Sequence, residues 1–155
     1  MRFYMVDRIE EIKYGEHIIG VKCISMSDDV FNEHFPGYPI FPGSLLMEGM
    51  AQLAGSLFEL TMMHRNEKVL RCVLSMVNRM KFRSLVVPGD KVILKAMAAS
   101  VHSDCALVKV RATVDDRVCA EGELTFTFHD VENPLVEAER ENLYRSYMRH
   151  AKVVE

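Results

Sequence analysis

The pattern of hydrophobic and polar positions predicts one long buried helix near the middle of the chain. From Ser44 to about Met63 there is no proline, and most residues favour helices. Apolar side chains occur on almost every side of this segment, as in a helix buried inside a domain. Ser44 is suited to cap its N-terminus. A narrow polar line, formed by Glu48, Gln52 and Ser56 at intervals of four residues, crosses the helix.

The segments on either side of this helix have the composition of strands. Residues 3–12 and 15–26 predict a hairpin that turns at Tyr14-Gly15. After the helix, turn residues separate four extended runs, at residues 69–83, 90–102, 105–114 and 117–128. Hydrophobic and polar side chains alternate in the last two runs, as in half-buried antiparallel strands. We therefore predict a hairpin, a long helix and a four-strand meander: an α+β fold with a curved antiparallel sheet wrapped around one central helix.

The last 25 residues differ from the rest of the chain. Pro134 follows Asn133, ends the last strand and is well placed to open a helix. A loose apolar stripe runs among many charged side chains and consists of Leu135, Ala138, Leu143, Tyr147 and Met148. We therefore predict a main domain at residues 1–130 and a C-terminal helical extension at residues 131–155. The extension either packs on the surface of the domain or contacts another subunit or a carrier protein.

Composition and charge narrow the class of protein. A chain of 155 residues suits one domain. Its formal net charge of −3 gives no sign of nucleic-acid binding. The central helix is long enough to span a membrane, but two carboxylates and a glutamine within it argue against a membrane span. No signal-peptide pattern opens the sequence and no cysteine stands at zinc-ligand spacing, so we expect a cytoplasmic protein without a bound metal.

The candidate chemistry lies where a stiff, proline-rich loop meets the central helix. His34 stands in this loop, and an imidazole titrates near neutral pH and can take a proton. Glu48 follows near the start of the helix. Apolar surroundings favour its protonated form, whereas the helix N-terminus favours the carboxylate, and the sequence leaves open which effect is larger. The first backbone N–H groups of the helix, near Gly43, have no partner within the helix and can polarise a carbonyl oxygen.

The residues of this region resemble a known family. The string His-Phe-Pro-Gly-Tyr-Pro-Ile-Phe-Pro-Gly at residues 34–43, followed by Glu48 and Met50-Ala51-Gln52, is similar to the signature of the FabZ-type β-hydroxyacyl-acyl carrier protein dehydratases. These enzymes have a hotdog fold. The histidine and the acid of the signature lie fourteen positions apart, as they do here (48 − 34 = 14). The segments 3–9 and 82–90 resemble further parts of the family, so the resemblance covers about residues 3–128.

The resemblance implies a reaction and a set of roles. It implies loss of water from (3R)-3-hydroxyacyl thioesters on acyl carrier protein, giving trans-2-enoyl thioesters in fatty acid or related acyl-chain biosynthesis, without a cofactor. In this comparison His34 removes the C2 proton, Glu48 delivers a proton to the C3 hydroxyl, and the amide of Gly43 binds the thioester carbonyl. The other expected substrate-binding residues are Phe35, Phe41, Gln52 and Phe82.

The resemblance also implies partners. The family works as a homodimer that pairs His34 of one subunit with Glu48 of the other, and three dimers often assemble. Because carrier proteins are acidic, a basic patch is needed, and Arg79, Lys81 and Arg83 are the candidates. The alternative is that these three residues form a solvated face of a strand. Two other functions compete: a hotdog acyl thioesterase, and a non-catalytic hotdog subunit that binds acyl carrier protein.

The sequence departs from the family at three places. Glu33 stands where the family has glycine. Its carboxylate either lies beside His34, where it would favour the protonated imidazole, or points to solvent. Leu85 replaces a proline of the later segment. The sequence begins at the first strand, so the family's preceding helix is not expected here. Glu48, rather than an aspartate, favours a dehydratase without the isomerase activity of the FabA-type relatives.

Overall fold

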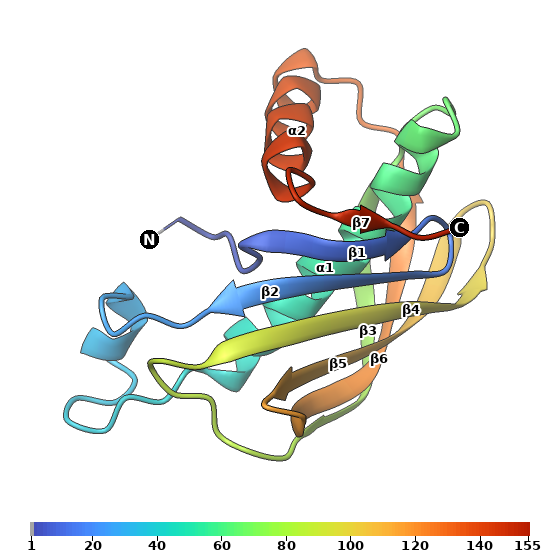
Figure 1. Ribbon diagram of the computed structural model, residues 1–155. Helices are drawn as coiled ribbons and strands as arrows, with labels where there is room; N and C mark the ends of the chain where they lie inside the picture. Colours follow the sequence, from blue (N-terminus) through green and yellow to red (C-terminus); the bar gives the residue numbers. More distant parts are fainter. Residues whose placement is uncertain (1) are drawn as a thin grey trace.

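One seven-stranded sheet curves around helix α1 (Gly43–His64) in the computed structural model, which describes residues 2–155 (Figure 1). The strands are β1 (Arg8–Lys13), β2 (His17–Cys23), β3 (Arg71–Phe82), β4 (Lys91–Val101), β5 (Cys105–Val114), β6 (Arg117–His129) and β7 (Lys152–Val153). A second helix, α2 (Pro134–Tyr147), lies outside the sheet, close to the N-terminal segment (Figure 1). The arrangement confirms the predicted α+β fold with one central helix.

The order of the strands differs in one respect from the prediction. The sheet runs β3-β6-β5-β4-β2-β1-β7, and all pairs except β1–β7 are antiparallel. Strands β4, β5 and β6 form a meander, but β3 pairs with β6 at the edge of the sheet instead of with β4. The predicted four-strand meander is therefore wrong. Residues 83–90, which connect β3 to β4, are too many for a tight hairpin and carry the chain to the other side of the meander.

The core lies between α1 and the sheet. The helix buries Leu46, Met50, Leu53 and Leu57, and the strands bury alternate residues against them. Strand β2 passes close to the helix at Gly20, where a Cβ atom would lie 2.7 Å from Cδ1 of Leu53. Each fully buried aliphatic side chain contributes about 1.5–3 kcal/mol to folding, so this layer supplies much of the stability of the domain.

The N-terminus of α1 is not capped by Ser44, so that prediction is wrong. The helix begins at Gly43, and Pro42 occupies the N-cap position without a side-chain hydrogen bond. The carbonyl oxygen of Pro42 accepts from the N–H groups of Leu45 and Leu46, over 3.1 and 3.0 Å. Proline suits this position because its ring fixes φ and it contributes no N–H group. Ser44 lies inside the first turn.

The chain before β1 follows the helix instead of pairing as a strand. The predicted first strand begins at residue 3, whereas β1 begins at Arg8. Gln52 of α1 explains the difference, because its side chain bonds to the backbone of this segment at two points. Its Oε1 accepts from the N–H of Met5 and its Nε2 donates to the carbonyl of Phe3, both over 2.9 Å.

The C-terminal residues form α2 and then return to the sheet. The side chain of Asn133 caps α2 by accepting from the N–H groups of the next two non-proline residues, over 3.0 and 3.4 Å. Tyr144 and Tyr147 are the buried residues of α2, whereas Leu135 and Ala138 are exposed, so the predicted apolar stripe is wrong at these two positions. Strand β7 then pairs with β1 in parallel, which the sequence did not indicate.

Candidate functional site

The imidazole of His34 presents one nitrogen with a lone pair. His34 lies in the loop between the 3₁₀ helix η1 (Asp29–Asn32) and α1, and its Nδ1 is 2.9 Å from the carbonyl oxygen of Ile40. Because a carbonyl only accepts, Nδ1 carries the hydrogen and Nε2 is the nitrogen that can accept a proton. The ring stacks on Phe35, with 4.3 Å between the ring centroids, and the peptide bond between the two residues is cis. His34 is therefore held in the tautomer that a base at Nε2 requires.

Gly43 places a backbone amide at the start of α1, beside an exposed aromatic ring. A Cβ atom at Gly43 would lie 2.9 Å from Cδ1 of Phe82, so only glycine lets this ring approach so closely. Phe82 lies at the end of β3 and keeps 54% of its surface exposed. The N–H of Gly43 precedes the first hydrogen bond of the helix, and the positive end of the helix dipole adds to its field. This geometry suits an oxygen atom that gains negative charge.

Glu48 lies on the second turn of α1 and is oriented by Gln52, one turn further along. Gln52 Nε2 donates to Glu48 Oε1 over 3.0 Å, in addition to its bonds to the N-terminal segment. Exchanging the amide nitrogen and oxygen of Gln52 would break all three bonds, so the network fixes the orientation of the amide. One oxygen of Glu48 is held in this way, while its other oxygen is not part of the network.

A cavity of about 440 Å³ lies beside Glu48, between α1, α2 and the N-terminal segment. Glu48, Gln52 and Ser56 line it from α1, which is the polar line that the sequence predicts. The apolar part of the lining consists of Phe3, Tyr4, Val136, Leu143 and Tyr147. Glu139 and Arg140 of α2, both exposed, complete the lining. The cavity thus combines polar and charged side chains with an aromatic and aliphatic part of its wall.

A single chain does not join the two predicted catalytic side chains. Within residues 2–155, the hydrogen bond of the His34 ring goes to Ile40 and that of the Glu48 carboxylate goes to Gln52, and no hydrogen bond or ion pair connects His34 with Glu48. Of the other predicted substrate-binding residues, Phe35 is half exposed beside His34. Phe41 is buried and packs near Phe31, with 6.4 Å between their ring centroids.

Strand β3 forms one edge of the sheet and carries several exposed apolar side chains. Val73, Met76, Val77 and Phe82 each expose about 40–58% of their surface. An edge strand with exposed apolar side chains favours pairing with another chain. Figure 1 shows β3 running alongside α1, so a partner on this edge would lie close to the helix.

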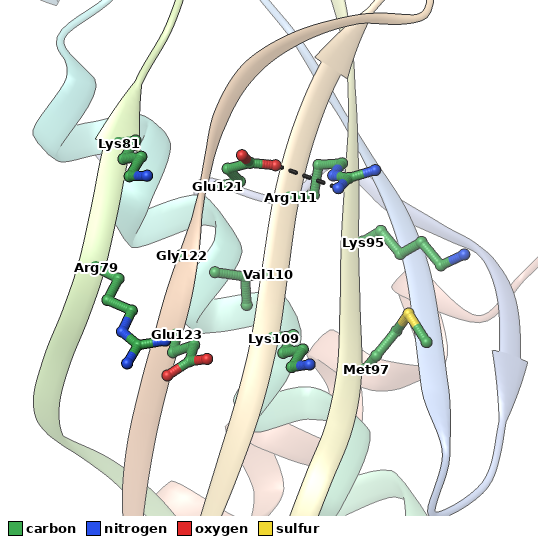
Figure 2. Close-up of a pocket in the computed structure, with 10 residues that line it drawn as sticks. All are labelled: Arg79, Lys81, Lys95, Met97, Lys109, Val110, Arg111, Glu121, Gly122 and Glu123. Carbon is green, nitrogen blue, oxygen red and sulfur yellow. Dashed lines mark ion pairs between the residues drawn. The ribbon is translucent and has the colours of Figure 1, made fainter.

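A groove lined mainly by basic side chains, here called the basic groove, lies on the outer face of the sheet, on the side away from α1 (Figure 2). Its volume is about 360 Å³, and its charged side chains are Arg79, Lys81, Lys95, Lys109, Arg111, Glu121 and Glu123. Five cations and two carboxylates give a local net charge of +3 (5 − 2), although the chain as a whole carries −3. Arg79 and Lys81 were predicted from the sequence as part of a basic patch, whereas the three cations of β4 and β5 were not. These three cations occupy exposed positions between buried residues of β4 and β5, and this alternation was the signal in the sequence that could have placed them on the outer face of the sheet.

Strand register explains why these charges meet. Lys95 of β4 is opposite Arg111 of β5, and Arg111 is opposite Glu121 of β6. Glu121 is in turn opposite Lys81 of β3. Like charges directly opposite each other destabilise a sheet. In this row of cations Glu121 compensates part of the positive charge, since it forms an ion pair with Arg111 over 3.2 Å. An anionic partner would relieve the remaining repulsion.

A buried network of charged and polar side chains lies at the other end of α1 and was not predicted from the sequence. Glu59 is only 3% exposed. Its Oε2 accepts from the hydroxyl of Tyr144 over 2.6 Å and from Nη1 of Arg71 over 2.9 Å. Burial and the nearby Glu59 carboxylate raise the pKa of Tyr144 well above its usual value, because both disfavour a phenolate. The only signal in the sequence was a second carboxylate within an apolar helix.

The described part of the chain holds no cluster of three or more histidine, cysteine or acidic side chains arranged for a metal ion. None of its helices has the length and hydrophobicity needed to cross a bilayer.

Comparison with known proteins shows to which family the chain belongs. The model of the FabA-like domain matches residues 1–123. The chain belongs to the FabA-like domain family. Two FabA-like relatives from Streptococcus pyogenes, of serotypes M3 and M1, are named 3-hydroxyacyl-[acyl-carrier-protein] dehydratase FabZ. Each is 38% identical over 122 residues, which cover 79% of this chain and 85% of the relative.

Solved structures confirm the hotdog fold of this FabA-like chain. The dehydratase heterocomplex ApeI:P from Xenorhabdus doucetiae superimposes with a TM-score of 0.70 at 12% identity, covering 88% of this chain and 90% of that chain. A hot-dog-like protein from Thermanaerovibrio acidaminovorans gives a TM-score of 0.60 at 18% identity, covering 92% and 94%. At these identities the likeness concerns the fold alone.

Proposed function

We propose that this protein is a 3-hydroxyacyl-[acyl carrier protein] dehydratase that converts (3R)-3-hydroxyacyl thioesters into trans-2-enoyl thioesters in acyl-chain biosynthesis. The observation that carries the proposal is the dehydratase signature at residues 34–52, whose histidine is held with Nε2 available as a base. Relatives named as this enzyme, 38% identical over most of the chain, support it.

The base in this mechanism is His34. Its Nε2 takes the proton from C2 of the substrate, and the electron pair left on C2 moves into the thioester carbonyl to form an enolate. A C2 proton is only weakly acidic, so the carbonyl oxygen must be stabilised as the proton leaves. The N–H of Gly43 at the start of α1 supplies this contact, and removing one such donor typically costs about 3–4 kcal/mol of transition-state stabilisation.

The acid is Glu48. Its protonated carboxyl gives its proton to the C3 hydroxyl, the bond between C3 and oxygen breaks, and water leaves. The enolate electrons return to form the double bond between C2 and C3. His34 ends the reaction protonated and Glu48 ends it as a carboxylate, and proton exchange with solvent restores both. Gln52 acts as a positioning residue, because its Nε2 holds one oxygen of Glu48.

The catalytic unit in this proposal is a homodimer, in which His34 of one subunit works with Glu48 of the other. Two observations support it: no bond joins the two side chains within one chain, and β3 offers an apolar open edge next to α1. Two copies joined at β3 would continue the sheet and bring the two α1 helices near each other. Three such dimers can assemble further without changing the sites.

The partner that carries the substrate is an acyl carrier protein, and the basic groove of Figure 2 is the docking surface that we assign to it. Its net charge of +3 complements an acidic protein, and Lys81 in the groove adjoins Phe82, which contacts Gly43 at the proposed site. Electrostatic docking of this kind mainly raises the rate of association.

Charge reversal tests this assignment. Lys95→Glu and Lys109→Glu together should raise KM for a carrier-bound 3-hydroxyacyl substrate by about tenfold or more, in a salt-dependent way. KM for the same acyl group on a small thiol should stay unchanged. Lys152→Glu, an exposed lysine of β7 outside the groove, serves as the control. Equal effects on the carrier-bound and the small substrate would contradict docking at the groove.

Turnover assays separate the proposed function from its competitors. The protein is incubated with 3-hydroxybutyryl and 3-hydroxydecanoyl carrier-protein thioesters, and mass spectrometry follows the acyl group. A dehydratase lowers its mass by the mass of one water and leaves the thioester intact. A thioesterase instead releases free thiol without that mass change. Binding of acyl carrier protein without either reaction would indicate a non-catalytic subunit.

A further inference from the structure

The cavity beside Glu48 has an apolar wall that α2 and the N-terminal segment build together. Val136, Leu143 and Tyr147 of α2 line it together with Phe3 and Tyr4 of the N-terminal segment. Its volume of about 440 Å³ falls in the range of about 300–1,000 Å³ that is typical of small-molecule sites. The match to the FabA-like domain ends at residue 123, before α2 begins, so the α2 side of this wall lies outside the family match.

Gln52 and Ser56 on the floor of the cavity are already bonded within the protein, and one oxygen of Glu48 remains outside this network. The amide of Gln52 bonds to Glu48, Phe3 and Met5. The hydroxyl of Ser56 donates to the carbonyl of Gln52 over 2.8 Å. An occupant therefore need not supply hydrogen bonds to Gln52 or Ser56, and its favourable contacts are with the apolar wall. Glu139 and Arg140 of α2 also line the cavity, but both are exposed, so their charges stay in contact with solvent. The aromatic and aliphatic part of the wall suits a hydrocarbon chain.

The wall is a fixed part of the fold, because α2 is a capped helix that is tied to the domain at two places. Asn133 caps its first turn, and the hydroxyl of Tyr144 donates to the buried carboxylate of Glu59 over 2.6 Å. Beyond the helix, β7 pairs with β1, and the N–H of Val154 donates to the carbonyl of Ile12 over 2.9 Å. A wall held in this way can limit the length of an occupant.

We propose that α2 bounds the acyl-chain pocket and sets the length of acyl chain that the enzyme accepts, with Leu143 as the residue that limits it. The inference rests on the proposed function, since Glu48 delivers its proton to the oxygen on C3 and also lies on the floor of the cavity. In this proposal the carbon atoms beyond C3 enter the cavity, whose α2 side includes Leu143. Short acyl chains end before they reach α2, whereas long chains contact it.

The experiment makes the side chain at position 143 larger in one variant and smaller in another. Leu143→Trp reduces the cavity and Leu143→Ala enlarges it, and Leu135→Trp is the matched control, because Leu135 lies on the same helix but is 76% exposed and outside the cavity. The quantity measured is the ratio of kcat/KM for 3-hydroxydecanoyl over 3-hydroxybutyryl carrier-protein thioester. Thermal unfolding of each variant verifies that it is folded.

We expect the ratio to fall about tenfold or more in Leu143→Trp, to rise in Leu143→Ala and to stay unchanged in Leu135→Trp. A ratio that does not move in either Leu143 variant, or that moves equally in Leu135→Trp, would overturn the inference. If Leu143→Trp does not fold, the direction of change in Leu143→Ala decides. If wild-type protein dehydrates only the short substrate, the inference requires Leu143→Ala to gain activity on the long one, and no gain would overturn it. Wild-type protein that dehydrates neither substrate would overturn the proposed function and this inference with it.

Discussion

At the scale of single residues, the chemistry depends on which atoms of His34 and Glu48 remain available. The carbonyl of Ile40 occupies Nδ1 of His34, and Gln52 occupies one oxygen of Glu48. The identity of both side chains followed from the sequence, because the signature is long and its spacing is specific. Their hydrogen bonds did not follow, because Ile40 reaches His34 only through the fold of the proline-rich loop.

Replacing Gln52 tests whether it positions Glu48. Gln52→Leu removes the bond to Glu48 Oε1 and leaves the N–H of Met5 without its acceptor. We expect kcat to fall about tenfold to a hundredfold with a much smaller change in KM, because the substrate still binds while the acid is less well oriented. Steady-state kinetics measures both constants. A rise in KM with unchanged kcat would show that Gln52 serves only to bind substrate.

At the scale of elements, the period of the hydrophobic pattern located α1 and the last three strands of the predicted meander within a few residues. It could not show that β3 pairs with β6, since hydrophobic alternation carries no information about which strand lies next to which. The hydrophobic pattern also could not predict where α2 lies on the domain. Tyr144 and Glu59 are 85 residues apart in the chain, and their contact depends on the whole fold.

The bond between Tyr144 and Glu59 should make α2 sensitive to both mutation and pH. Tyr144→Phe removes a hydrogen bond to a buried carboxylate and should lower the free energy of unfolding by about 1.5–3 kcal/mol near neutral pH. The pKa of Tyr144 is raised in the folded state, so above pH 10 the unfolded chain loses this proton first and the advantage of tyrosine over phenylalanine shrinks as pH rises. Denaturant unfolding at several pH values measures this difference. An advantage that grows with pH would contradict the buried, protonated Tyr144.

At the scale of the whole molecule, the proposed active site is complete only when two chains meet. Within one chain, His34 and Glu48 bond to different neighbours, and β3 leaves its apolar side chains at an open edge. The sequence indicated the dimer only through the family resemblance. Periodicity could not reveal the edge, because a strand in the middle of a sheet and one at its edge have the same alternation.

Placing a charge on this edge should separate the subunits. Val77→Lys puts a charged side chain on the open edge of β3, where valine is 40% exposed. Charged residues on edge strands oppose pairing, so the variant should become monomeric and lose its dehydratase activity while it stays folded. Size-exclusion chromatography with light scattering measures the mass. Val101→Lys, at an exposed position of β4, is the control and should leave the assembly intact. An active monomer of Val77→Lys would show that the site does not need a second chain.

The proposal that two subunits share one active site is tested most directly by mixing two inactive variants. His34→Ala and Glu48→Gln are each assayed for loss of water from 3-hydroxydecanoyl carrier protein, and then the two proteins are unfolded together, refolded and assayed again. Each variant alone should be inactive. In the mixture, half of the dimers combine both variants and each contains one intact site, so about a quarter of the wild-type activity should return. Activity that stays absent in the mixture, with mixed dimers verified by mass, would contradict a site shared between two subunits.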